Sequence, residues 1–219
     1  MNHKQLWANR RHFIASLTAC GLSPWAYASN TPHAAHILVL GDSLSAEYGL
    51  ARGSGWVALL ERQLQQAGIS AKLTNASISG DTTSGGRTRL PALLQQHRPS
   101  VVIIELGAND ALRGLPLKGT LDNLRAMTQA AQAAGAKVLL LGMQMPPNYG
   151  KKYAQDFEQI YVRVAKEFNT ALVPAFFKNV ADAANTTDLF QGDRIHPTAQ
   201  AQPILLANVW PHLQPLLRR

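Results

Sequence analysis

The chain has 219 residues, of which 46% are hydrophobic and 16% charged, and its formal net charge is +8. This length and apolar content suit one sizeable hydrophobic core and leave little room for a second domain. No apolar run approaches the roughly 20 residues that a membrane-spanning helix needs, and no basic run with interleaved aromatic residues appears, so the sequence argues against membrane-spanning and nucleic-acid-binding classes.

Residues 1–28 are predicted to form an export signal peptide, which leaves 29–219 as a single domain. Arg10 and Arg11 precede a short apolar stretch, and Ala26-Tyr27-Ala28 has the small-x-small pattern of a cleavage site. The paired arginines fit a twin-arginine signal of a bacterium and an ordinary secretory signal equally well. Both routes predict a periplasmic or secreted protein.

Cys20 is the only cysteine of the chain. Within Leu17-Thr18-Ala19-Cys20 it fits a lipoprotein box, which is the lesser alternative because the apolar region before it is short. Cleavage after Ala28 would leave no cysteine and therefore no disulfide, so packing alone must stabilise the mature domain. Its remaining positive charge suits contact with anionic lipid or envelope surfaces.

From residue 36 onward, short β-rich runs alternate with longer amphipathic patterns, which predicts an α/β fold with helices on both faces of a parallel sheet. The predicted strands are His36 to Leu40, Lys72 to Asn75, Val101 to Leu106, Lys137 to Met143 and Ala171 to Val173. Apolar residues at helical spacing predict cover helices over Trp56 to Ala67, Leu121 to Met127, Phe157 to Phe168 and Ala199 to Leu217. No repeat or linker divides the domain.

Polar motifs come after the predicted strands. They are Gly41-Asp42-Ser43-Leu44 after the first strand, Ser79-Gly80-Asp81 after the second, Gly107-Ala108-Asn109-Asp110 after the third, and Asp193 with His196 beyond the fifth. In an open α/β sheet the ligand crevice lies at the carboxyl ends of the strands. We therefore expect all four loops to face one cleft.

The residue types in these loops are those of a serine hydrolase. A serine hydroxyl such as that of Ser43 needs a base to take its proton, and the base needs a third group to fix its tautomer. His196 and Asp193 are three residues apart on one turn, so the carboxylate can bind one ring nitrogen and leave the other to face Ser43. The backbone N–H groups of Ser43 and Gly80 and the side-chain amide of Asn109 are candidate oxyanion donors.

In order and spacing, four blocks of the chain resemble those of the SGNH, or GDSL, hydrolase family: Gly41-Asp42-Ser43-Leu44-Ser45, Gly80, Gly107-Ala108-Asn109-Asp110 and Asp193-Arg194-Ile195-His196-Pro197. The resemblance covers the chain from residue 36. It implies that Ser43 is the nucleophile, that Asp193 and His196 complete the triad, and that Ser43, Gly80 and Asn109 form the oxyanion hole. It also implies a three-layer α/β/α sandwich of flavodoxin-like architecture, with five parallel strands in the order 2-1-3-4-5.

Further stretches resemble the subgroup of exported bacterial thioesterases, lysophospholipases and arylesterases: Arg89-Leu90-Pro91-Ala92-Leu93-Leu94, Pro147-Asn148-Tyr149-Gly150 and Ala201-Gln202-Pro203. The resemblance implies an esterase that works through an acyl-enzyme on Ser43, without a cofactor or an obligate protein partner, on lipid-like, thioester or aryl ester substrates. One alternative is a carbohydrate acetylesterase of the same family. The other is a catalytically silent lipid- or glycan-binding protein, against which the intact set of reactive residues argues.

Two positions depart from the family pattern. Arg194 stands between the acid and the base where relatives often carry glycine, and Ala108 replaces a glycine of many relatives. We expect Arg194 to affect specificity, by narrowing the cleft mouth or favouring anionic substrates. Asp42 is predicted to hydrogen-bond the loop around Ser43, not to act as a third acid, and Asp110 to do the same for the Asn109 turn.

Apolar residues in the loops after the third and fourth strands fit either core packing or an acyl-chain pocket. They are Leu112, Leu115, Pro116, Leu117, Met145, Pro146 and Pro147. Because these loops flank the predicted cleft, we favour the pocket, with Leu112, Leu115, Pro116 and Pro147 as the substrate-binding candidates. No metal site is predicted, since Asp193 and His196 lack further ligands at suitable spacing.

Overall fold

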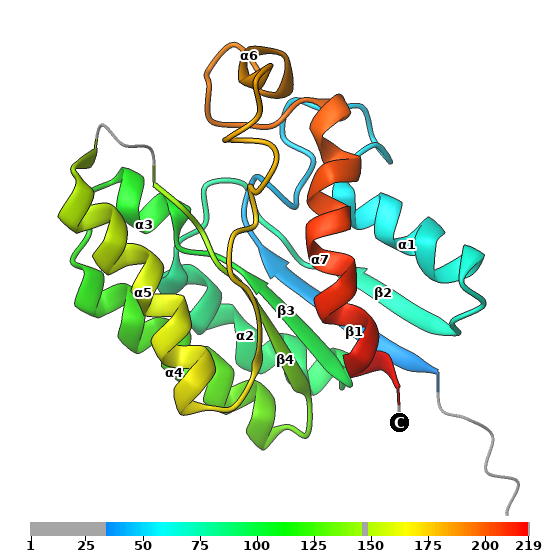
Figure 1. Cartoon of the computed structure of the whole chain (residues 1–219). Helices are drawn as coiled ribbons and strands as arrows, with labels where there is room; N and C mark the ends of the chain where they lie inside the picture. The colour runs from blue at the N-terminus through cyan, green and yellow to red at the C-terminus, as the bar shows by residue number, and fades with distance from the viewer. Residues whose placement is uncertain (1–33, 146–148, 219) are drawn as a thin grey trace, which may run out of the picture. The chain divides into compact units, whose positions relative to one another are not determined.

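The computed structural model describes residues 34–145 and 149–218 (Figure 1). The predicted export signal, the lipoprotein alternative at Cys20 and the candidate Pro147 lie outside the described residues. From Ala34 onward the chain forms one unit by its internal contacts. None of the helices in this described part is long and apolar enough to cross a membrane.

Five parallel strands form a single sheet in the order β2-β1-β3-β4-β5, which confirms the predicted order. They are β1 (Ala35–Gly41), β2 (Ala71–Asn75), β3 (Val101–Glu105), β4 (Lys137–Leu141) and β5 (Ala171–Val173). All of β3 and most of β1 are buried, as expected of central strands that are covered on both faces.

Two of the strands end earlier than the apolar runs that predicted them. The β3 strand stops at Glu105, one residue short of the predicted Leu106, where its neighbour β1 also ends, and β4 stops at Leu141 because β5 offers only three residues for pairing. The apolar residues beyond these strand ends are still buried, so hydrophobicity alone overestimates the strand length.

Helices cover both faces of the sheet (Figure 1). On one face α2 (Thr83–His97), α4 (Leu117–Ala133) and α5 (Lys151–Glu167) pack side by side, and on the other α1 (Trp56–Gln66) packs against α7 (Gln202–Leu217). The short helices α3 (Ala108–Leu112) and α6 (Thr186–Leu189) and the 3-10 turn η2 (Ala199–Ala201) belong to the connections after β3 and β5.

The topology brings the loops after β1 and β3 together. Chain order reverses at this point, because β2 pairs with one edge of β1 and β3 with the other. Such a switch point is where open α/β sheets bind ligands. The last residues of the two strands, Gly41 and Glu105, are paired in register, so the segments that carry Ser43 and Asn109 begin side by side.

Candidate active site

Ser43 lies in a turn directly after β1. The carbonyl oxygen of Asp42 accepts hydrogen bonds from the N–H groups of Ser45 and Ala46 at 3.3 and 3.0 Å, and the Ser43 carbonyl accepts one from Tyr48 at 3.3 Å. These bonds close the turn around the serine. The Ser43 side chain is half-buried, and its Oγ lies 2.9 Å from Nε2 of His196.

Asp193 binds both the backbone and the ring of His196. One carboxylate oxygen accepts the N–H groups of Ile195 and His196 at 2.9 and 3.0 Å, and the other lies 2.6 Å from His196 Nδ1. The His196 backbone N–H, followed by the ring contact, holds the pKa of Asp193 at about 2. An ionised carboxylate can only accept, so the proton lies on Nδ1 and Nε2 is free to accept the Ser43 hydroxyl proton.

Gln191 joins the His196 loop to the Ser43 loop. Its side-chain amide donates to the carbonyl oxygens of Tyr48 at 2.9 Å and Pro197 at 3.1 Å, and its backbone N–H donates to the His196 carbonyl at 2.8 Å. The ring of Tyr48 in turn lies against the His196 ring, with centroids 4.3 Å apart. The loop that carries Ser43 and the loop that carries His196 are therefore joined by two contacts, the hydrogen bonds of Gln191 and the ring contact of Tyr48.

Asn109 follows β3 in the first turn of α3. Its side-chain Nδ2 donates to Asp42 Oδ2 at 2.9 Å. An asparagine amide has two N–H donors, so one remains to bind a substrate oxygen. The preceding Gly107 has a φ of +125°, and a Cβ there would collide with the hydroxyl of Tyr161, so only glycine allows this close approach to the α5 helix.

Gly80 lies in the loop after β2 with a φ of +78°, a conformation that glycine adopts without strain. Its carbonyl accepts a hydrogen bond from Nη2 of Arg113 at 2.7 Å, so the carbonyl is occupied from the α3 side. Among the described residues, the backbone N–H groups of Ser43 and Gly80 have no hydrogen-bond acceptor. Both groups are thus available to a developing oxyanion.

An ion pair between Arg89 and Asp81 restrains the loop that carries Gly80. Arg89 on α2 donates from Nε to Asp81 Oδ2 at 2.8 Å, and its Nη2 donates to the Gly41 carbonyl at 3.2 Å. Its Nη1 also donates to the Ala76 carbonyl. One arginine therefore joins the ends of β1 and β2 to the loop that carries Gly80. The sequence marked Arg89 only as part of a family-like stretch.

The two aspartates that were predicted to support the loops have different partners. Asp42 behaves as predicted, since Oδ1 accepts the Leu44 N–H at 3.0 Å and Oδ2 accepts Asn109; burial raises its pKa to about 6 against the effect of these bonds. Asp110 instead accepts from the N–H of Thr83 at 2.8 Å and from its hydroxyl, so it ties α3 to the start of α2 and not to the Asn109 turn.

Arg194 is exposed between Asp193 and His196, and its backbone has a φ of +59°. This left-handed conformation is uncommon for residues with a side chain. It supplies a physical reason for a preference for glycine at this position. Ala108, the other departure from the family pattern, is half-buried at the start of α3.

The structure divides the apolar cluster that was predicted to form an acyl pocket. Met145 is buried in the core, whereas Leu112 and Leu115 are 36% and 39% exposed and Pro116 is exposed beside them. Arg113, between the two leucines, is bound to the Gly80 carbonyl. This bond joins the segment that carries Leu112 and Leu115 to the Gly80 loop.

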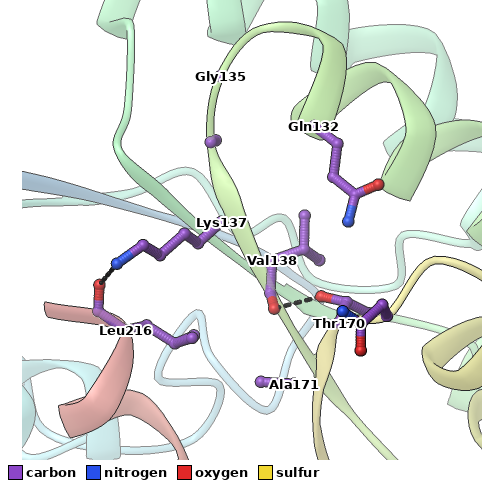
Figure 2. Close-up of a pocket in the computed structure, with 9 residues that line it drawn as sticks. Gln132, Gly135, Lys137, Val138, Thr170, Ala171 and Leu216 are labelled. Carbon is purple, nitrogen blue, oxygen red and sulfur yellow. Dashed lines mark hydrogen bonds between the residues drawn. The ribbon is translucent and has the colours of Figure 1, made fainter. Parts of the chain in front are cut away.

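A separate pocket of about 410 Å³ lies at the opposite end of the sheet, among the first residues of β4 and β5 (Figure 2). Its polar groups are largely occupied: Lys137 Nζ donates to the Leu216 carbonyl at 2.9 Å, and Thr170 Oγ1 donates to the Val138 carbonyl at 2.5 Å. The pocket contains none of the predicted site residues. Within residues 34–145 and 149–218, no group of three or more His, Cys, Asp or Glu side chains is arranged to hold a metal ion.

The sequence did not single out Tyr48 or Gln191. Gln191 meets the Tyr48 carbonyl across 143 positions of the chain, and no local pattern marks either residue. Arg113 also lacked a signal, because an arginine between exposed leucines is ordinary surface composition. A contact of this kind becomes visible only when the loops are folded.

The sequence is similar to known proteins over most of its length. The sequence profile of the GDSL-like lipase/acylhydrolase family matches residues 39–203. The chain is 52% identical to esterase TesA of Pseudomonas aeruginosa, over 83% of this chain and 89% of that protein. It is 43% identical to thioesterase 1/protease 1/lysophospholipase L1 of Escherichia coli K12, over 83% of this chain and 84% of that protein.

The chain is also similar in three dimensions to a solved esterase structure. The psychrotrophic esterase EstA from a Pseudoalteromonas species, whose crystal structure is of the enzyme inhibited by monoethylphosphonate, superimposes with a TM-score of 0.77. The match covers 84% of this chain and 99% of EstA at 40% sequence identity. The similarity therefore extends over nearly the whole of that enzyme.

Proposed function

The chain belongs to the GDSL-like lipase/acylhydrolase family and is a serine esterase of that family, and we propose that it cleaves acyl esters and thioesters through an acyl-enzyme on Ser43. The observation that carries the proposal is the relay of two short hydrogen bonds, from Ser43 to His196 at 2.9 Å and from His196 to Asp193 at 2.6 Å. This arrangement is what activation of a serine hydroxyl requires.

In the acylation step, Ser43 Oγ attacks the carbonyl carbon while its proton passes to Nε2 of His196. The carbonyl π electrons move to oxygen, which three donors face: the N–H groups of Ser43 and Gly80 and the free amide hydrogen of Asn109. When the tetrahedral species collapses, the bond to the leaving oxygen or sulfur breaks and His196 donates its proton to that atom.

Deacylation repeats the sequence with water in place of Ser43. His196 takes a proton from the water, the hydroxide adds to the acyl carbon, and Ser43 leaves with the proton that His196 returns. In both steps the low pKa of Asp193 keeps its carboxylate charged, so it holds the ring in one tautomer and stabilises the imidazolium. The base therefore does not have to reorient between the two half-reactions.

For the substrate we propose esters with an extended acyl chain, lysophospholipids among them, together with acyl thioesters. Leu112, Leu115 and Pro116 support this class, because they expose apolar surface in the segment that Arg113 joins to the Gly80 loop. The name of the Escherichia relative, a thioesterase and lysophospholipase, supports it as well, and the name of the Pseudomonas relative supports ester hydrolysis. An acetyl group would contact little of this apolar surface.

The test is a panel of p-nitrophenyl esters from acetyl to palmitoyl, measured beside a lysophospholipid, an acyl-CoA and an acetylated sugar. We expect kcat/KM to rise with chain length beyond acetyl and the lysophospholipid to be hydrolysed. A preference for the acetylated sugar would show the carbohydrate acetylesterase instead.

The matched control is Ser43→Ala, which should lower kcat by roughly 10⁶-fold and lose labelling by a fluorophosphonate. Turnover that survives this change would refute the proposed nucleophile.

We also propose that the protein is exported to the periplasm or beyond, on the support of the signal-like pattern in residues 1–28. Cell fractionation with and without residues 1–28 tests this. Retention of the complete chain in the cytoplasm would contradict it.

A further inference from the structure

A carboxyl group lies buried beneath the Ser43 turn and has no part in the proposed reaction. Glu105 is the last residue of β3 and is wholly buried. Glutamate is seldom buried unless hydrogen bonds to its carboxyl group replace those it made to water. The contacts of Glu105 therefore indicate what it does.

Both contacts of Glu105 go to the residues that flank the nucleophile. Its Oε2 accepts the backbone N–H of Asp42 at 3.3 Å and the hydroxyl of Ser45 at 2.7 Å. Glu105 Oε2 therefore binds the turn at the residue before Ser43 and again at the second residue after it.

The Ser45 hydroxyl takes part in two hydrogen bonds, one as donor and one as acceptor. Trp56 Nε1 lies 3.1 Å from Ser45 Oγ, and an indole N–H can only donate. Ser45 therefore accepts from Trp56, and its hydroxyl donates to Glu105 Oε2. This oxygen is an acceptor in both of its bonds, whether or not the carboxyl group carries a proton on Oε1.

Gly41 provides the space for this contact. It pairs in register with Glu105, and a Cβ at this position would lie 2.8 Å from each of three oxygens: Glu105 Oε2, Ser45 Oγ and Ser77 Oγ. Any side chain at position 41 would displace the carboxyl group from the turn. The glycine that precedes Asp42 and Ser43 is thus required for close approach and not for backbone freedom.

Asp42 connects the same carboxyl group to the oxyanion side. While its N–H binds Glu105, its side chain accepts from Leu44 N–H and from the Asn109 amide. Both Asp42 oxygens are occupied, whereas Glu105 Oε1 has no partner among the described residues. Burial and the neighbouring Asp42 raise the pKa of Glu105 well above its ordinary value, so a neutral group can accept at Oε2 without a second buried charge.

We propose that Glu105 is a positioning residue for the nucleophile: its Oε2 binds the turn on both sides of Ser43 and so fixes the serine between His196 and the oxyanion donors. The inference rests on the proposed role of Ser43. Because a small displacement of the reacting atoms lowers the rate far more than it lowers substrate binding, the effect of losing Glu105 should fall on kcat.

The experiment compares Glu105→Gln, which keeps a carbonyl oxygen and the size of the side chain, with Glu105→Leu, which keeps similar volume without an acceptor. We expect Glu105→Leu to lower kcat and the rate of fluorophosphonate labelling by about 10- to 100-fold, with KM within about threefold of wild type. Glu105→Gln should restore kcat to within about threefold of wild type. The matched control is Thr128→Val, a buried polar-to-apolar change on α4 outside the site, which should leave kcat unchanged.

A folded Glu105→Leu enzyme with wild-type kcat would overturn the inference, and so would a Glu105→Gln enzyme as impaired as Glu105→Leu. If Glu105→Leu does not fold, Ser45→Ala decides, because it removes one of the two bonds to Oε2 and should lower kcat by roughly 2- to 10-fold; unchanged kcat there refutes the proposal. Ser43→Ala separates the two hypotheses, since activity in that variant overturns the proposed function itself.

Discussion

The phenol ring of Tyr48 lies on the imidazole ring of His196, with centroids 4.3 Å apart and planes inclined by 38°. Tyr48 is half-exposed, so its ring separates one face of His196 from solvent. The two loops that carry these rings are joined independently by Gln191, which binds the Tyr48 and Pro197 carbonyls. The aromatic contact is therefore a second restraint on the orientation of the base.

We predict that Tyr48→Ala lowers kcat/KM by roughly 2- to 10-fold, because an aromatic pair contributes about 0.5 to 1.5 kcal/mol beyond its buried area. Tyr48→Phe keeps the ring and should retain most of the activity. Gln191 binds only the backbone of Tyr48, so its contact remains in both variants. Steady-state kinetics on one p-nitrophenyl ester tests this. Equal losses in both variants would show that the hydroxyl, and not the ring, is what matters.

The strands were predictable because buried parallel strands form continuous apolar runs, whereas their order was implied by the family resemblance. Helix α2 was not predicted, since Ser84, Gly85 and Gly86 in its first turn are weak helix formers. The Thr82 side chain caps this turn by accepting the Gly85 N–H at 3.3 Å. A Cβ on Gly86 would collide with Leu106, so tight packing against the sheet accounts for glycine there. Tertiary contacts therefore outweigh local propensity in α2.

The site was predictable to the extent that its residues occur in short motifs at strand ends. Tyr48 and Gln191 were not predictable, because their contacts join loops that are distant in the chain. Glu105 carried a signal that was overlooked: it is a charged residue at the end of the apolar run Val101–Ile104, where burial is expected. A carboxylate in such a run indicates a specific partner.

Asn109→Ala should lower kcat by about 10²- to 10³-fold and change KM much less, because an oxyanion donor acts mainly on the transition state. The same change removes a hydrogen bond from buried Asp42, so the variant should also unfold at lower denaturant concentration. Asn123→Ala is a suitable control, since its amide binds Thr83 away from the nucleophile. A loss confined to KM would assign Asn109 to substrate binding.

Arg194→Gly should raise the free energy of unfolding by up to about 1 kcal/mol. The left-handed backbone of Arg194, with φ of +59°, costs roughly 1 to 2 kcal/mol for a residue with a Cβ, and the greater freedom of glycine in the unfolded chain offsets part of the gain. Arg194→Ala keeps the Cβ and should not be stabilised. Urea unfolding of the three proteins measures the difference. Equal stability of the glycine and alanine variants would exclude backbone strain as the reason for the family's glycine.

The buried carboxyl pair Asp42 and Glu105 should make the protein less stable as pH rises. Burial raises the pKa of Asp42 to about 6, and burial and the neighbouring Asp42 raise the pKa of Glu105 well above its ordinary value. At pH values between the ordinary pKa of each group and its raised pKa, the folded state binds more protons than the unfolded state. This pair therefore contributes stability that is greatest below about pH 4 and, for Asp42, is lost as pH rises through about 6.

The contribution of Asp193 to stability depends on pH in the opposite direction. Its pKa is lowered to about 2, so its contribution is present above pH 4 and is lost as pH falls toward 2. Urea unfolding from pH 4.5 to 8 therefore isolates the buried pair from Asp193, and comparison with Glu105→Gln cancels the groups that the two proteins share. We expect the wild type to lose more stability than Glu105→Gln across this range, because glutamine cannot ionise. Identical pH slopes in the two proteins would mean that Glu105 binds its proton equally well in the folded and the unfolded state, and the raised pKa of Glu105 would have to be abandoned.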